Sequence, residues 1–252
     1  MAINNLVEVF CDFDGTITKR DTVDHLLESL ADNTASPSWE EIEALWVSGE
    51  IGSRECMAQQ VALLRGGWTA VEKELATLEI DPTFKSFAKF CKDRKIKLVV
   101  VSDGLDRVIA HILKREGIEV DGIFANHLEE DATGNLKLSF PFAPRGQYLA
   151  KNCGSGMCKC QIINEAPLSP MRIVIGDSRS DFCWSGEADL VFAKKKLLEY
   201  CLDNNLNHKP FTSFTEIEAE FERIVSEPVV PKPVVPVSQM SPAAQQVAPV
   251  LL

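Results

Sequence analysis

The segment that most limits how this chain folds is Leu6–Cys11, a largely apolar run that ends directly before Asp12-Phe13-Asp14-Gly15. A short apolar run bounded by a glycine turn is typical of a strand buried on both faces, as in parallel sheets covered by helices. Alternate residues of an extended chain point the same way, so Asp12 and Asp14 project together while Phe13 turns into the core. The sequence therefore predicts two carboxylates side by side at the end of a buried strand.

A second apolar run, Lys97–Val101, ends at the tripeptide Ser102-Asp103-Gly104. We expect a turn there, and a turn that frees backbone N–H groups can hold a phosphate oxygen. Lys159 stands at the start of a predicted helix, 159–165, and offers a single mobile cation. These residues are therefore candidates for binding an anionic group.

A third buried strand is predicted at Arg172–Ile175, and it ends at Gly176-Asp177 with Asp181 four residues further on. Adjacent carboxylates repel one another unless a cation lies between them, and a hard ion such as Mg²⁺ binds carboxylate oxygens. Because ligands of open α/β sheets bind at the carboxyl ends of the strands, we expect these acids to face one site together with Asp12.

Taken in order, the strand before DFDGT, the strand before Ser102, Lys159 and the strand before GDxxxD resemble the haloacid dehalogenase superfamily of phosphohydrolases, across residues 6–194. The resemblance implies an α/β fold with a Rossmann-like parallel sheet, Mg²⁺ as cofactor and a small phosphorylated metabolite as substrate. It implies that Asp12 is the nucleophile that forms an aspartyl-phosphate, and that Asp14 is the general acid and base.

The resemblance also implies a metal site formed by Asp12, the backbone carbonyl of Asp14 and Asp177, with Asp181 holding metal-bound water or orienting Lys159. Ser102, Lys159 and backbone amides would share the charge of the transferring phosphoryl group. Relatives of the phosphoserine phosphatase type often carry Gly where this chain has Asp103. We expect the Asp103 side chain to turn away from the phosphate while its backbone N–H stays available.

After Thr16 the pattern changes from strand to helix, with Asp21 as a helix N-cap. We expect an α/β core formed by residues 1–18 and 82–226, and a small helical cap domain, 19–81, inserted between the first two strands and folded over the active site. The other predicted elements are cap helices near 39–47, 53–64 and 68–78, a helix at 82–93, a hairpin at 122–140, a last strand at 190–193, and helices at 197–204 and 215–226.

Composition and charge exclude some partners. The net charge of −11 comes without a basic stripe, which argues against nucleic acid, and no apolar run approaches the roughly 18 residues of a membrane helix. We expect a cytoplasmic protein of undetermined oligomeric state. The Pro-Val-rich segment 227–252 predicts a disordered tail.

The eight cysteines are scattered, so reduced thiols are expected. Three of them, Cys153, Cys158 and Cys160, fall in one loop beside Lys159. A soft-metal site is the alternative to an oxidation-sensitive loop, but an obvious fourth ligand is missing. The others that we expect to be small core residues are Cys11, Cys91, Cys183 and Cys201.

The substrate is less constrained than the chemistry. The stretch 202–217 and the Cys-rich loop resemble the methionine-salvage members of the superfamily, which makes an enol phosphate a candidate; a plain loop between helices is the alternative. Glu28 is a candidate contact for an amine, as in phosphoserine or phosphoethanolamine, although a solvated helix charge is the commoner role. Phosphocholine, and a catalytically idle scaffold that only binds a phosphorylated ligand, are further alternatives.

Overall fold

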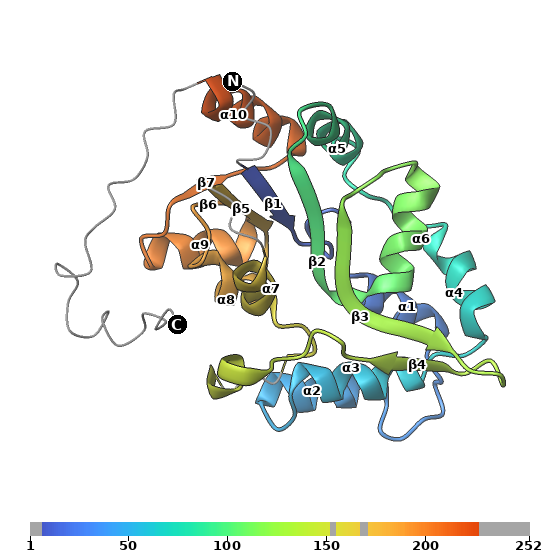
Figure 1. Ribbon diagram of the computed structural model, residues 1–252. Helices are drawn as coiled ribbons and strands as arrows, with labels where there is room; N and C mark the ends of the chain where they lie inside the picture. The colour runs from blue at the N-terminus through green and yellow to red at the C-terminus, as the bar shows by residue number, and fades with distance from the viewer. Residues whose placement is uncertain (1–6, 152–154, 167–170, 227–252) are drawn as a thin grey trace.

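The computed structural model describes residues 7–151, 155–166 and 171–226, so Cys153 and the predicted tail lie outside it. Its centre is a seven-stranded sheet in the order β4-β3-β2-β1-β5-β6-β7 (Figure 1). The strands are β1 Val7–Cys11, β2 Lys97–Leu105, β3 Gly122–Glu130, β4 Leu136–Ser139, β5 Met171–Gly176, β6 Leu190–Ala193 and β7 His208–Pro210. Helices cover both faces, which confirms the predicted α/β class.

Strand β1 lies at the middle of the sheet and is buried along its whole length. It runs parallel to β2 on one side and to β5 on the other, so that Phe10 is level with both Val99 and Val174. Each other neighbouring pair is also parallel, apart from β3 and β4. The carboxyl ends of β1, β2 and β5 therefore meet at one edge, as the sequence predicts.

Alternate residues of the strands belong to two separate hydrophobic clusters, one on each face of the sheet. Val9 and Cys11 belong to the cluster that α5, α6 and α10 complete, while Phe10 packs on the opposite face with residues of α7, α8 and α9. The helices are α1 Thr22–Leu30, α2 Trp39–Ser48, α3 Ser53–Ala62, α4 Gly67–Leu75, α5 Phe84–Asp93, α6 Asp106–Glu116, α7 Lys159–Glu165, α8 Phe182–Ser185, α9 Lys195–Asp203 and α10 Phe214–Ser226, with short 3₁₀ turns at Gly146–Lys151 and Arg179–Asp181. Among the residues described, no helix is both long enough and apolar enough to cross a membrane.

Helices α1 to α4 form between β1 and β2, where the sequence predicts a helical insertion. Asp21 caps α1 as expected, with its side chain accepting from the backbone N–H groups of Val23 and Asp24. The chain enters and leaves this segment at adjacent points, because Thr18 and Ile80 form an antiparallel bridge. Helix α3 of this segment packs against β4, which lies at the edge of the sheet (Figure 1).

The predicted hairpin is confirmed: β3 and β4 pair in antiparallel register around a turn held by the Asp131 carboxylate, which accepts from the backbone N–H groups of Thr133 and Asn135.

Two expectations about strands are wrong. Strand β2 does not end at Val101 but continues to Leu105 with an irregular register, so Ser102-Asp103-Gly104 is part of a strand and not a turn.

The strand at 190–193 is also not the last, because β7 follows it at the sheet edge. The alternative that the sequence offers here is a plain loop between helices with Pro210 as a breaker, and β7 lies within that segment. Proline lacks an N–H donor, and an edge strand tolerates that loss because one of its sides pairs with nothing.

Candidate active site

Three carboxylates converge where β1 and β5 end. Asp12 extends β1, with its backbone N–H donating to the carbonyl of Ile175 at 2.9 Å, and Asp177 follows the last residue of β5. An oxygen of Asp12, one of Asp177 and one of Asp181 lie within 4.8 Å of one another, and all three residues are buried. The structure thus brings together the acids that the sequence proposed as one cluster.

Lys159, the first residue of α7, lies among these acids with only 1% of its surface exposed. Its Nζ donates to Asp12 Oδ1 at 2.6 Å, to Asp181 Oδ1 at 2.8 Å and to Ser180 Oγ at 3.3 Å, and it lies 5.0 Å from the centre of the Trp184 ring. Burial lowers the pKa of Lys159, but the charges of Asp12 and Asp181 outweigh it and raise the pKa above its usual value. Lys159 is therefore a fixed cation, and not the mobile one that its sequence context suggested.

Asp181 is held by protein donors on both of its oxygens. Oδ1 accepts from Lys159 and from Trp184 Nε1, and Oδ2 accepts from the backbone N–H groups of Asp177 and Ser178 at 3.0 and 3.1 Å. A carboxylate with this many donors is well placed to orient Lys159 and the loop after β5.

Among the described residues, fewer donors contact the Asp12 carboxylate than the Asp181 carboxylate. Burial, followed by the neighbouring charge of Asp181, raises the pKa of Asp12 well above its usual value despite the contact with Lys159. A divalent cation beside Asp12 would reverse this, since it favours the ionised carboxylate. The hard oxygens of Asp12 and Asp177, buried beside a third carboxylate, suit Mg²⁺.

Asp14 points to a different environment from Asp12. Its Oδ1 accepts from the backbone N–H of Thr22, the first residue of α1, and its Oδ2 accepts from Ser102 Oγ at 3.2 Å. Burial, followed by the charge of Asp21, raises the pKa of Asp14 to about 7. A carboxyl group with such a pKa can both give and accept a proton near neutral pH.

The end of β2 faces Asp14. Ser102 is buried, and its hydroxyl also accepts from the backbone N–H of Gly104 at 2.9 Å, so this N–H is not left free as the turn prediction required. A Cβ at position 104 would lie 2.6 Å from Asp14 Oδ2, which explains why glycine stands there. Ser102 is thus the group of this tripeptide that contacts the catalytic candidates directly.

Asp103 turns its side chain away from Ser102. Its Oδ1 accepts from Asn126 Nδ2 at 3.2 Å, and its Oδ2 accepts from Ser53 Oγ at 3.3 Å. Burial raises the pKa of Asp103. Of the candidate phosphate-binding residues, Asp103 therefore offers only its backbone, while its carboxylate joins β2 to β3 and to the first residue of α3.

Glu28 is not brought into this cluster. It is exposed on α1, where it forms an ion pair with Arg20 at 2.6 Å. Cys11, Cys91 and Cys201 are buried as expected, but Cys183 is exposed, because it occupies the outer side of the short helix α8. The Sγ atoms of Cys158 and Cys160 lie 3.4 Å apart.

Two contacts to Asp177 were missed by sequence reasoning. Thr16 Oγ1 lies 3.3 Å from Asp177 Oδ1, and Lys195 Nζ lies 2.8 Å from Asp177 Oδ2. Thr16 directly follows Asp12-Phe13-Asp14-Gly15, so its place in this motif could have indicated that it lies near the acids. Lys195 follows the end of β6, and the only signal was its place after a further parallel strand.

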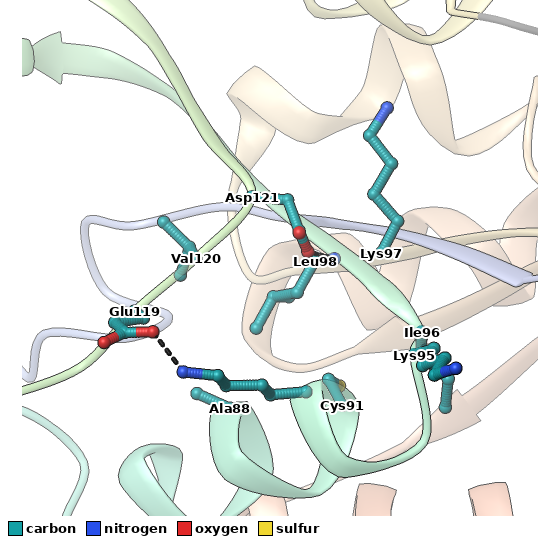
Figure 2. Close-up of a pocket in the computed structure, with 10 residues that line it drawn as sticks. Ala88, Cys91, Lys95, Ile96, Lys97, Leu98, Glu119, Val120 and Asp121 are labelled. Carbon is teal, nitrogen blue, oxygen red and sulfur yellow. Dashed lines mark hydrogen bonds and ion pairs between the residues drawn. The ribbon is translucent and has the colours of Figure 1, made fainter. Parts of the chain in front are cut away.

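A cavity of about 450 Å³ lies at the opposite end of β2 from Ser102 (Figure 2). It is lined by residues at the start of β2, by α5 and by the segment before β3, and it contains the ion pair between Lys92 and Glu119. Its position at the amino ends of the strands separates it from the acids described above.

The comparisons with known proteins agree with these motifs. The family model of the haloacid dehalogenase-like hydrolases matches residues 9–185. The chain is 29% identical over 222 residues to the 2-hydroxy-3-keto-5-methylthiopentenyl-1-phosphate phosphatase of Bacillus cereus, covering 87% of this chain and 97% of that protein.

Solved structures share the fold. A phospho-aspartyl intermediate analogue of phosphoserine phosphatase superposes with a TM-score of 0.61 at 20% identity, covering 86% of this chain and 99% of the other. A phosphoserine phosphohydrolase-like protein from Francisella tularensis gives 0.62 at 19% identity, covering 84% and 98%.

Proposed function

Because this chain belongs to the haloacid dehalogenase-like hydrolases, we propose that it is a Mg²⁺-dependent phosphomonoesterase that forms an aspartyl-phosphate on Asp12. The observation that carries the proposal is the arrangement in which the buried Asp12 contacts Lys159 while the half-buried Asp14, two residues on, contacts Ser102. One strand end thus presents two carboxyl groups in different environments, as a nucleophile and a proton donor require.

In the first half of the reaction an Asp12 oxygen attacks phosphorus, the bond from phosphorus to the leaving oxygen breaks, and Asp14 gives its proton to that oxygen. In the second half Asp14 takes a proton from water, the water oxygen attacks phosphorus, and Asp12 is released with inorganic phosphate. Lys159 and the Ser102 hydroxyl stabilise the charge on the phosphoryl oxygens. Mg²⁺, held by Asp12, Asp177 and the Asp14 carbonyl, would supply further positive charge there.

For the substrate, the similarity to a methionine-salvage phosphatase over nearly all of that relative supports 2-hydroxy-3-keto-5-methylthiopentenyl-1-phosphate. The likeness to phosphoserine phosphatases concerns the fold. The exposed position of Glu28 and its pairing with Arg20 give no support to amine recognition by that residue.

Phosphate release from a panel of phosphorylated metabolites tests the proposal. The panel contains the methionine-salvage enol phosphate, phosphoserine, phosphocholine and phosphoethanolamine, each with Mg²⁺, with Ca²⁺ and with EDTA. We expect turnover with Mg²⁺, none with EDTA and little with Ca²⁺, whose looser coordination misplaces the phosphoryl group. The enol phosphate should give the highest kcat/KM.

Asp12→Asn is the decisive variant, because the change is nearly isosteric but removes the nucleophile. It should lower kcat by about 10³-fold or more while the protein stays folded. Asp203→Asn, an exposed acid at the end of α9, is the control and should leave kcat unchanged. Near wild-type turnover by Asp12→Asn would show that Asp12 is not the nucleophile. A wild type that hydrolyses none of the panel would favour the idle scaffold instead.

A further inference from the structure

Lys195 is the second cation that touches the cluster of acids. Its side chain is 57% exposed, yet its Nζ lies 2.8 Å from Asp177 Oδ2 and 3.3 Å from the carbonyl oxygen of Gly15. Its backbone φ of 50° lies in the left-handed region, which residues other than glycine rarely adopt. Lysines at a helix start usually extend into water, so a chain that bends back onto two acceptors of the site is a specific arrangement.

The neighbouring Lys194 strengthens this arrangement. Its Nζ donates to the carbonyl of Thr16 at 3.2 Å and lies 5.1 Å from the centre of the Phe211 ring. Two consecutive lysines therefore bind two consecutive carbonyls of the loop after β1. Thr16 Oγ1, in the same loop, contacts Asp177 Oδ1, so both carboxylate oxygens of Asp177 have partners.

Asp177 Oδ2 faces this loop closely. A Cβ on Gly15, whose φ is 74°, would lie 2.5 Å from that oxygen. Oδ2 therefore lies between the Gly15 backbone and the Lys195 ammonium, and any further cation on Asp177 must share the carboxylate with Lys195.

We propose that Lys195 is a tethered counter-cation of the metal site, which competes with Mg²⁺ for Asp177 and so sets the metal affinity. The inference rests on the proposed function, because it takes Asp177 as a Mg²⁺ ligand. An ion bound to Asp177 at about 2.1 Å lies within roughly 7 Å of the ammonium. At such a separation the repulsion between a single and a double positive charge, in water of low ionic strength, corresponds to about a tenfold weaker binding constant, and added salt reduces this effect.

The same contact has the opposite effect on the protein without divalent metal. Asp12, Asp177 and Asp181 are buried within 4.8 Å of one another, and Lys159 contacts the first and the third. Lys195 is the cation paired with the second. Removing its charge should therefore tighten Mg²⁺ binding and, in EDTA, destabilise the fold.

Lys195→Met tests both consequences in the full chain. Methionine keeps most of the aliphatic stem and meets the same backbone strain, so the charge is what changes. Lys196→Met is the matched control, since Lys196 is the next residue, is exposed and carries the same charge. Lys195→Arg restores the charge. Isothermal titration with Mg²⁺ alone, at fixed ionic strength, gives Kd, and thermal unfolding in EDTA and in saturating Mg²⁺ gives Tm.

The expected result is a Kd for Mg²⁺ about tenfold lower in Lys195→Met than in the wild type, with Lys196→Met and Lys195→Arg within about twofold of the wild type. In EDTA the Tm of Lys195→Met should fall below that of Lys196→Met, and saturating Mg²⁺ should close the gap. Equal or weaker Mg²⁺ binding by Lys195→Met, with a wild type that binds Mg²⁺, would overturn the competition and leave the proposed function standing. A wild type that binds no Mg²⁺ would overturn both.

Discussion

Asp14 differs from the other acids of the site in what touches it. Its oxygens contact the first backbone N–H of α1 and the hydroxyl at the end of β2, while Asp12, Asp177 and Asp181 cluster on the side of Lys159. The single residue Phe13, fully buried, separates the two environments. This division is what would let Asp12 and Asp14 take the different roles that we propose for them.

The first prediction concerns Asp14. Asp14→Asn keeps the shape but cannot carry a transferable proton, so kcat/KM for an alkyl phosphate should fall by about 10²–10⁴-fold. The loss should be much smaller for 4-nitrophenyl phosphate, whose leaving oxygen departs without a proton. Steady-state kinetics on both substrates check this, with Asp203→Asn as control. Equal losses for the two substrates would show that Asp14 does not protonate the leaving group.

At the scale of elements, Asp103 connects segments that are far apart in the chain. It lies in β2 beside Ser102, and its carboxylate reaches Asn126 in β3 and Ser53 in α3. The inserted helices are thus hydrogen-bonded to the strand that carries Ser102. A glycine at this position would have no side chain to form such a link.

The second prediction follows from this connection. Ser53→Ala removes one hydrogen bond and should lower the free energy of unfolding by about 0.5–1.5 kcal/mol. Asp103→Ala removes that bond and the bond from the Asn126 amide to the carboxylate, so it should cost about 1–3 kcal/mol, although the amide still donates to the Asp103 backbone carbonyl. Because the α3 contact is lost in both, the double variant should be no less stable than Asp103→Ala alone.

Chemical denaturation of the four proteins gives this cycle. Ser48→Ala is the control, because the Ser48 hydroxyl donates locally, to Leu45 and Glu50 at the end of α2. Steady-state kinetics test whether the hydrogen bond positions the inserted helices for substrate binding or only adds stability. If it positions them, Ser53→Ala should raise KM more than it lowers kcat. Full additivity of the two stability losses would rule out the link.

The elements could be predicted wherever local pattern decides them. The strand before Asp12 is specified by an apolar run and the Asp131 turn by its turn residues, and both form where expected. The helix 159–165 also forms where expected. Strand β7 could not be predicted in this way, because Pro210 opposes a strand and only the neighbouring β6 makes an edge position available. The extension of β2 past Ser102 likewise depends on pairing with β3.

The same distinction between local pattern and long-range packing applies to the candidate site. Asp12, Asp177 and Lys159 could be placed from the motifs, since strand ends of a parallel sheet must meet. The contacts of Asp103 with Ser53 and of Lys195 with Asp177 span 50 and 18 positions, and nothing in the local sequence specifies them. They depend on how the inserted helices and α9 pack on the sheet.

For the whole molecule, the described site residues fall between Asp12 and Lys195, so the third prediction concerns the tail. A chain that ends at Ser226 should keep its Tm, and its kcat/KM should stay within about twofold of the full chain. Ending at Thr212 instead removes α10, whose Phe214 and Phe221 are buried against Phe87. Each lost aromatic costs about 3–5 kcal/mol, so that shorter chain should not fold.

Circular dichroism and phosphate release on the two truncated proteins check this. A folded chain ending at Ser226 with strongly reduced turnover would assign the Pro-Val segment a part in catalysis. A folded chain ending at Thr212 would show that α10 is dispensable for the core.

The bridge between Thr18 and Ile80 has a consequence for how such a protein can change over generations. The chain departs from the sheet and returns to it through neighbouring positions, with the backbone N–H of Asp81 donating to the carbonyl of Ile17 at 2.7 Å. A segment whose ends lie side by side can be lengthened, shortened or replaced without moving the strands on either side of the insertion. Recombination at these two positions would exchange the inserted helices, which we propose cover the substrate, while the candidate catalytic carboxylates stay in place. Substrate specificity could then evolve separately from the chemistry.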